Sequence, residues 1–165
     1  MRGELITTFL EMNERPSIAV TPPHRSGMLL RLDPPTVGFY RYLYDAVGRR
    51  WGWLERAAMT DEALGDLLAD DRIDVFVLYL GGVPAGFFEL DRRIDHELHL
   101  AHFGLVSEFI GRGLGKWLLA AAVEAAWDHE PVRVWVSTTN RDHPKGLMTY
   151  QWAGFEAYDS RREDG

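Results

Sequence analysis

Three glycines at alternate positions, Gly111, Gly113 and Gly115, follow an apolar, strand-like segment and lead into an apolar, helix-like segment. Glycine has no Cβ, so its backbone can approach a ligand closely and can adopt positive φ angles. The N-terminus of a helix offers unpaired N–H groups and roughly half of a positive charge. Together these features predict a binding site for a phosphate or a diphosphate group.

Two common phosphate-binding loops do not fit this spacing. A Walker A loop requires a glycine where the sequence has Ile110 and a serine or threonine where it has Trp117. A dinucleotide-binding loop accommodates the first two glycines but requires a third where the sequence has Lys116. The sequence therefore argues against a nucleoside triphosphatase and against a Rossmann-type dinucleotide-binding protein.

The first turn of the expected helix carries two cations, Arg112 and Lys116, and no acidic residue. A helix N-terminus without a ligand favours Asp or Glu over cations, by a few tenths to about 1 kcal/mol. We therefore expect both cations to flank a bound anion. The alternative is that both are the solvated ends of long side chains.

Composition limits the classes of function. A chain of 165 residues can bury a substantial core, and we find no internal boundary, so we expect a single domain over residues 1–165. The net charge of −7 and the lack of a basic stripe argue against a nucleic-acid partner. The absence of cysteine excludes disulfides and a thiolate nucleophile. We see neither a signal peptide nor a membrane span, so we expect a cytoplasmic protein without a membrane partner.

Apolar periodicity and turn residues predict strands mixed with helices. We expect an irregular connection over the proline-rich residues 14–35, a helix N-cap at Thr60 and a hairpin turn at Gly81 and Gly82. This order indicates an α/β, or layered α+β, domain. The expected strands cover residues 6–12, 74–80, 85–90, 96–106, 132–137 and 155–158, and the expected helices cover residues 39–47, 60–70, 113–129 and 144–152.

Two segments carry a family resemblance. The run from Phe103 to Gly115 resembles motif A of the GNAT superfamily, the acetyl-CoA-dependent N-acetyltransferases. In that family a Gln/Arg-x-x-Gly-x-Gly/Ala pattern follows a central strand, and the loop amides hold the diphosphate of CoA. The segment from Tyr150 to Phe155 resembles the family's Tyr-x-x-x-Gly-Phe ending. The order of elements agrees, and the resemblance covers roughly residues 74–158.

This resemblance implies a mixed, splayed central sheet with helices on both faces. Acetyl-CoA would be the co-substrate, without a metal, and a primary amine on a small molecule or peptide would attack its thioester directly in a ternary complex. Many relatives dimerise, so a homodimer is a further expectation. The residues expected to bind CoA are Leu105, Val106, Ile110, Gly111, Arg112, Gly113, Leu114, Gly115, Lys116 and Asn140.

Two positions depart from the family pattern. The family's Gln/Arg falls on Ile110, which can offer a phosphate only its backbone. The family's frequent Asn before the Tyr falls on His143, so Asn140, one turn earlier, is our candidate for that polar contact to the pantetheine arm. The Asp142–His143 pair suggests a metal site or a catalytic triad only superficially, and we expect it to cap the following short helix.

The implied reaction requires a donor for the thioester oxygen, an acid for the leaving thiolate and a neutral amine. Backbone N–H groups around Leu105 and Val106 are the expected donors for the oxygen. The family motif places Tyr150 near the sulfur as the general acid. A core tyrosine that only packs its ring is the alternative.

Glu89, Glu97, His99 and His102 are the candidate bases. Alternation along a strand predicts Glu97 and His99 on one face and His102 on the other. Several relatives that acetylate protein lysine carry a glutamate six residues before the position matched to Leu105, and that count selects His99. Many relatives have no dedicated base, and a histidine without a catalytic role is equally compatible with the sequence.

An aromatic cluster lies within and just after the first expected helix, residues 39–47. Its members lie where relatives form the acceptor-side wall of the cleft, although aromatics at such spacing are more often core residues. Two other functions stay open: a catalytically silent CoA-binding sensor or partner module of the same fold, and a plain phosphate- or nucleotide-binding protein. The aromatic residues are Tyr40, Tyr42, Tyr44, Trp51 and Trp53.

Overall fold

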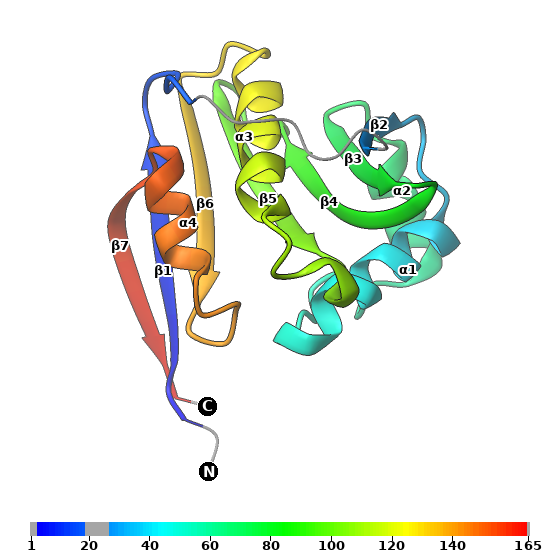
Figure 1. Ribbon diagram of the computed structural model, residues 1–165, viewed down its shortest axis with the longest axis horizontal. Coiled ribbons are helices and arrows are strands. Elements are labelled where there is room, and N and C mark those ends of the chain that lie inside the picture. The colour runs from blue at the N-terminus through cyan, green and yellow to red at the C-terminus, as the bar shows by residue number, and fades with distance from the viewer. Residues whose placement is uncertain (1–2, 19–26, 165) are drawn as a thin grey trace.

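The computed structural model describes residues 3–18 and 27–164. Across these residues, seven strands form one sheet in the order β2-β3-β4-β5-β6-β1-β7, with helices on both faces (Figure 1). This arrangement confirms the expected mixed, layered α/β fold. The strands are β1 (Leu5–Met12), β2 (Gly27–Leu32), β3 (Ile73–Leu80), β4 (Val83–Asp91), β5 (Glu97–Leu105), β6 (Arg133–Thr139) and β7 (Glu156–Glu163). The helices are α1 (Val37–Gly48), α2 (Asp61–Ala69), α3 (Leu114–Trp127) and α4 (Gly146–Ala153), with short 3-10 helices at Arg49–Trp51 and Ser107–Phe109.

Two edge strands differ from the prediction. β2 lies within residues 14–35, where we expected irregular chain, and it pairs antiparallel with β3. Flanking prolines hide this short strand in the sequence, and its pairing is set by the neighbouring edge of β3. Residues 19–26 of that connection lie outside the described part. β7 is longer than expected, and all of its residues are exposed at the opposite edge of the sheet.

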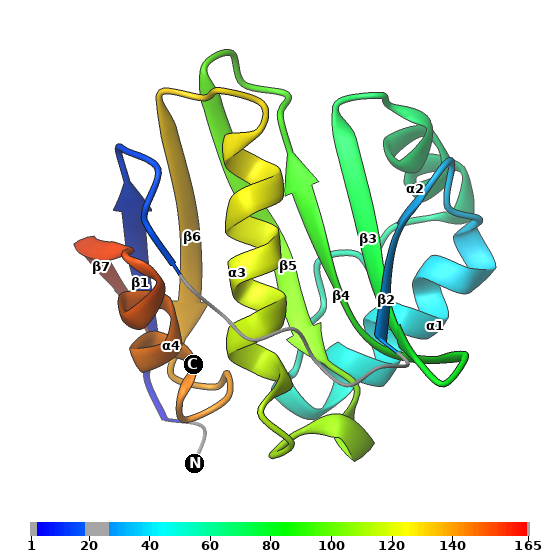
Figure 2. The ribbon, with the colours of Figure 1, turned by 45° about the horizontal axis from the view of Figure 1, so that its top comes forward.

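Each face of the sheet carries its own apolar core. On the face covered by α3 and α4, Phe88 and Leu118 are fully buried. On the face covered by α1 and α2, Tyr40 and Phe87 are fully buried. Helix α3 lies across β5 (Figure 2), and this burial explains its nearly continuous apolar sequence.

The parallel strands β5 and β6 pair over only a short seam. The paired residues are Glu97 with Arg133, Leu98 with Val134 and His99 with Trp135. Beyond this seam the two strands diverge toward their carboxyl ends (Figure 1). The chain leaves β5 through the glycine loop and enters α3, so the gap between the strands opens beside the N-terminus of that helix.

A β-bulge changes the direction of side chains halfway along β5. Glu89 of β4 pairs with His102, but the next residue, Leu90, pairs with Leu100. Ala101 is therefore an extra residue on β5, and the alternation of faces is interrupted there. In a regular strand, residues an odd number of positions apart point to opposite faces of the sheet. Across this bulge, residues an odd number of positions apart instead point to the same face.

None of the helices within residues 3–18 and 27–164 has both the length and the apolar character needed to cross a bilayer.

Replacing Leu118 with alanine should leave a cavity, because this α3 side chain is fully buried between helix and sheet. We expect the free energy of unfolding to fall by about 2–5 kcal/mol in urea denaturation. The matched control is Met148→Ala on α4, where the side chain is 67% exposed, and its change should stay within about 0.5 kcal/mol. Equal losses in the two variants would contradict the assignment of the core.

Candidate active site

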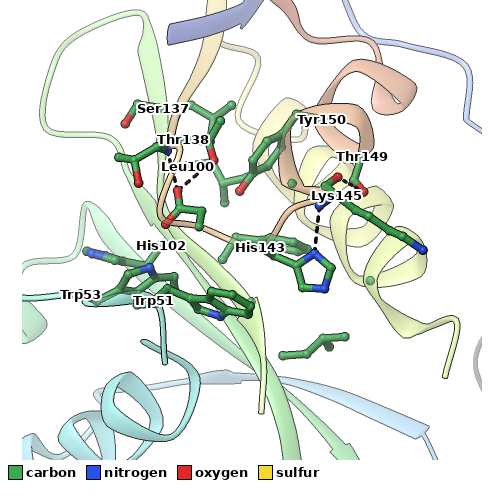
Figure 3. Close-up of a pocket in the computed structure, with 18 of the residues that line it drawn as sticks. Trp51, Trp53, Leu100, His102, Ser137, Thr138, His143, Lys145, Thr149 and Tyr150 are labelled. Carbon is green, nitrogen blue, oxygen red and sulfur yellow. Dashed lines mark hydrogen bonds between the residues drawn. The ribbon is translucent and has the colours of Figure 1, made fainter. Parts of the chain in front are cut away.

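A cavity of about 460 Å³ occupies the gap where β5 and β6 diverge. The carboxyl-terminal halves of both strands, the glycine loop, the start of α4 and the segment that follows α1 all contribute to its lining. Figure 3 shows Tyr150 and His102 reaching it from different elements, α4 and β5. The short seam therefore creates the space, and segments far apart in the sequence supply its chemistry.

The glycine loop ends in an open helix N-terminus. Gly111 and Gly113 have φ angles of 84° and 77°, which other residues adopt only with strain. Gly113 is the N-cap of α3 and provides no side-chain cap, so the first N–H groups of the helix have no intrahelical acceptor. A Cβ at either glycine would meet no atom within 4 Å, so backbone conformation rather than crowding requires glycine. This open N-terminus is compatible with the predicted anion site, which stays a prediction.

Six of the predicted CoA-binding residues border the cavity, and two cations do not. Arg112 lies over the ring of Phe109, with its guanidinium carbon 5.2 Å from the ring centroid. The ammonium of Lys116 lies 4.9 Å from the ring centroid of Trp152. Both side chains thus contact aromatic rings and lie outside the cavity lining. The bordering residues are Leu105, Ile110, Gly111, Gly113, Leu114 and Gly115.

Val106 and Asn140 point elsewhere. The N–H of Val106 donates to the carbonyl of Ala85 at 2.8 Å, so it is not available to a ligand. Because N–H directions alternate along a strand, the N–H of Leu105 faces the β6 side, toward the gap. The Asn140 side chain bonds the backbone of β1, accepting from Ile6 at 3.0 Å and donating to Glu4 at 2.9 Å. Its predicted contact with the pantetheine arm does not fit this placement.

Tyr150 of α4 lines the cavity from the side of the helix. Its ring meets Phe103 and Phe155 edge-on, with centroids 6.1 and 5.8 Å away. Burial, and secondarily the carboxylate of Asp142, raises the pKa of the Tyr150 phenol above its usual value. The phenol therefore stays protonated at neutral pH and can act as a proton donor.

His99 does not reach the cavity. Its ring stacks flat on Trp135, with centroids 3.6 Å apart and an interplanar angle of 1°. Burial lowers the pKa of His99 to about 4, and the nearby carboxylate of Asp91 only partly opposes this effect. A base with so low a pKa gains little driving force for accepting a proton from an ammonium. The geometry therefore does not support the predicted role of His99.

His102 takes the place that we predicted for His99. The bulge at Ala101 brings His99 and His102 to the same face of β5, contrary to the expected alternation. His102 is 8% exposed and lines the cavity. The count of six residues before Leu105 selected His99 and so missed His102, because a bulge inside a strand leaves no reliable signal in the sequence.

Glu89, one of the candidate bases, lies buried behind His102. Its carboxylate accepts hydrogen bonds from the Tyr40 hydroxyl and from Nη2 of Arg56, the latter at 2.7 Å. Nδ1 of His102 lies 3.4 Å from Oε1 of Glu89. Burial by itself would raise the pKa of Glu89, but His102 and Arg56 together lower it to about 2. Glu89 is therefore a buried anion bound by Tyr40 and Arg56, with His102 beside it.

Aromatic side chains form part of the cavity lining. Tyr44, Trp51 and Trp53 line it, whereas Tyr40 is buried against Glu89 and Tyr42 is exposed. Three of the five aromatic residues expected to form the acceptor-side wall therefore line the cavity, and the other two do not.

Trp53 is held by close contacts at the end of α1. Its ring lies directly on Gly48, where a Cβ would come within 2.4 Å of it, and its centroid is 5.2 Å from that of His102. Across the cavity, the ring of His143 lies 5.3 Å from that of Trp51. The segment after α1 and the loop before α4 thus meet at the cavity.

Asp142 orders the loop after β6 instead of capping α4. Its Oδ2 accepts from the Thr138 hydroxyl at 2.8 Å and from the Thr139 N–H at 2.7 Å. His143 accepts the Lys145 N–H at 3.0 Å through Nδ1, which fixes its ring beside the cavity. Within the described ranges, no cluster of three or more His, Cys, Asp or Glu side chains could hold a metal ion.

A family model described as "Acetyltransferase (GNAT) family" matches residues 37–155 of the chain. This range contains the glycine loop, both divergent strands, His102 and Tyr150. Among curated protein sequences, none matches the chain.

Solved structures with the same fold share little sequence with this chain. A GCN5-related N-acetyltransferase from Sphaerobacter thermophilus is 14% identical, with a TM-score of 0.72 over 99% of this chain and 52% of that one. An aminoglycoside acetyltransferase from an uncultured soil metagenomic sample is 16% identical, with a TM-score of 0.64 over 78% of this chain and 88% of that one. The ribosomal-protein-S18-alanine N-acetyltransferase from Escherichia coli is 14% identical, with a TM-score of 0.65 over 81% and 79%. The chain spans about half of the Sphaerobacter thermophilus protein, and these likenesses show the fold.

Replacing Glu89 with glutamine should change how stability depends on pH. A carboxyl whose pKa is lowered by folding contributes stability above its unfolded pKa, and this contribution is lost as the pH falls through the folded value. The folded pKa of Glu89 is about 2, so the wild-type free energy of unfolding should fall from about pH 5 toward pH 2. In Glu89→Gln the free energy of unfolding should fall less steeply over this pH range. The variant should also be less stable at neutral pH, because Arg56 loses its anion.

Glu55→Gln is the control for this measurement by chemical denaturation at a series of pH values. Glu55 also contacts Arg56, at 3.1 Å, but its side chain is 71% exposed. Its slope should match that of the wild type. A Glu89→Gln slope equal to the wild-type slope would show that Glu89 is not held as a buried anion.

Proposed function

We propose that this chain, which belongs to the acetyltransferase (GNAT) family, transfers an acetyl group from acetyl-CoA to a primary amine. The observation that carries the proposal is one cavity, between diverging strands, that joins an open helix N-terminus to the side chain of Tyr150. The first feature suits an anionic diphosphate, and the second suits a leaving thiolate. The proposed reaction is direct attack of the amine, and the lack of cysteine excludes an acyl-cysteine intermediate.

The main chain from Ile110 to Gly115 fits the diphosphate of CoA. The positive φ angles of Gly111 and Gly113 suit a loop whose backbone N–H groups bind an anion, as in an anion-binding nest. Ile110 has no polar side chain for this purpose, so its contribution is limited to the backbone. Bound CoA supplies the activated acetyl thioester, and the loop fixes where that thioester lies.

The residues around the thioester supply a donor and an acid. The N–H of Leu105 faces the gap and suits the carbonyl oxygen as that oxygen gains charge, an interaction typically worth about 3 kcal/mol. The amine forms a C–N bond to the acetyl carbon as the C–S bond breaks. Tyr150 donates its proton to the departing sulfur and regains one from the new amide nitrogen. The products are the acetylated amine and free CoA thiol.

The acceptor end suits an amine on a small molecule or a peptide. Its aromatic lining can contact an apolar body or a cation, and the carboxylates of Glu55 and Asp142 also border the cavity. Structures of the same fold include an aminoglycoside acetyltransferase and a ribosomal-protein-alanine N-acetyltransferase, so the fold accommodates both kinds of acceptor.

A CoA-binding module without catalysis is the alternative, and the family departures at Ile110 and His143 favour it. Thiol release from acetyl-CoA distinguishes the two functions. We would follow free thiol with a panel of small amines, polyamines and peptides. Amine-dependent release supports the transferase, whereas CoA binding without release by any amine would support the silent module.

Gly113→Ala should weaken CoA binding. Alanine at a φ of 77° is strained by about 1–2 kcal/mol, and relief of the strain would turn the N–H groups of α3 away from the diphosphate. We expect at least a tenfold rise in the Kd for CoA by calorimetry, which corresponds to about 1.4 kcal/mol.

The control for that variant is Gly82→Ala in the hairpin between β3 and β4. Gly82 has a φ of 82° and, like Gly113, an open Cβ position. The two variants should lose similar stability, but only Gly113→Ala should lose affinity. Unchanged CoA affinity in Gly113→Ala would remove the loop from the proposed site.

Tyr150→Phe should lower kcat by about 10²–10⁴ and leave the Kd for CoA nearly unchanged, because only the proton donor is removed. Steady-state thiol release and calorimetry measure the two quantities. Tyr42→Phe, on the exposed side of α1, should leave both unchanged. A Tyr150→Phe enzyme with the wild-type kcat would show that Tyr150 only packs its ring.

A further inference from the structure

We propose that His102, oriented by the buried carboxylate of Glu89, is the base that takes the proton from the acceptor ammonium. This inference rests on the proposed acetyl transfer and names a residue that performs one of its steps. At a usual pKa near 10.4, about one primary amine in 2,500 is neutral at pH 7, so a base at the site has a substantial effect.

The position of His102 is the first support. It lines the same cavity as Tyr150 but reaches it from the opposite side, from β5 next to Trp53 (Figure 3). Its ring is enclosed by Tyr44 and Trp53, whose centroids lie 5.0 and 5.2 Å away. The ring is therefore fixed in place at the aromatic end, where the amine would enter.

The orientation of the imidazole is the second support. Nδ1 is buried and faces Oε1 of Glu89 at 3.4 Å, and no described residue makes a hydrogen bond with it. A carboxylate in front of Nδ1 favours the tautomer that keeps the proton there. Nε2, on the far side of the ring from Glu89, then carries the lone pair and can accept a proton.

The charges around the ring are the third support. Glu89 is an anion in a buried site, and Arg56 and the Tyr40 hydroxyl both bind it. The carboxylate lies beside the imidazole ring that accepts the proton at Nε2. The titratable and charged groups that face His102 are Glu89 on β4, Tyr40 and Tyr44 on α1, Arg56 with Glu55 after α1, and His99 on β5.

The proton balance of the step is simple. One N–H bond of the ammonium breaks, and its proton binds Nε2 of His102. The freed lone pair makes the C–N bond described above, and His102 returns its proton to solvent after the products leave. Tyr40, Glu89 and Arg56 touch neither substrate in this scheme, so they are positioning residues.

The pH dependence of kcat/KM tests the proposal. Wild-type kcat/KM should fall at low pH as the imidazole is protonated. His102→Ala should lower kcat/KM at neutral pH by about 10²-fold or more, lose this acid limb, and regain part of the rate when imidazole is added. His99→Ala, the matched control on the same strand, should keep the limb. A His102→Ala enzyme with the wild-type rate or the wild-type limb would overturn the proposal.

Two further readouts separate a catalytic role from a structural one. Glu89→Gln should move the acid limb to lower pH, since the anion that favours the cationic ring is gone. In ¹⁵N NMR spectra of the CoA-bound wild-type protein, the imidazole signals of His102 are identified by their absence from the spectrum of His102→Ala. At neutral pH these signals should show a proton on Nδ1 and none on Nε2. A proton on Nε2 instead would overturn the proposal without any measurement of activity.

The outcomes also distinguish this inference from the function on which it rests. If the unaltered enzyme releases no thiol with any amine, the proposed transfer fails and the role of His102 fails with it. If the unaltered enzyme is active and the His102 variant behaves like it, the transfer stands and only the base assignment fails. Retained CoA affinity in His102→Ala shows that the variant is folded.

Discussion

The site depends on an incomplete hydrogen-bond ladder at the centre of the sheet. β5 and β6 pair through three residue pairs and then separate, which leaves the backbone of both strands facing a gap. Backbone groups cannot be left unpaired in a dry interior without a large cost, so such a gap must be filled by water or by a ligand with polar groups of its own. The separation also brings the glycine loop, α4 and the segment after α1 around one space, although these elements are far apart in the sequence.

Burial makes the two sides of this space chemically different. Near α4, low polarity keeps the Tyr150 phenol protonated. Across the cavity, a carboxylate with an arginine and a tyrosine hydroxyl remains charged although it is fully buried. An isolated buried anion would be costly, and the hydrogen bonds to Glu89 explain why this one persists. The fold thus holds the protonated phenol of Tyr150 and the imidazole of His102, which lies beside the Glu89 carboxylate, at opposite sides of a single cavity.

Sequence reasoning predicted the parts of the protein that local patterns determine. The glycine spacing indicated the loop that leads into α3, Thr60 indicated the start of α2, and the helix expected over residues 144–152 corresponds to α4, which brings Tyr150 to the cavity. It failed where long-range pairing decides the outcome. β2 exists because β3 offers it an edge, and the side on which His102 lies follows from one inserted residue, Ala101.

The last strand limits how copies of the molecule can meet. β7 lies at the end of the sheet with every side chain exposed, and a bare strand edge can pair with another strand. If two copies of β7 paired antiparallel about their centre, Glu156 of each would stand opposite Glu163 of the other. Like charges in that position repel each other, and the resulting penalty opposes pairing of two copies through this edge.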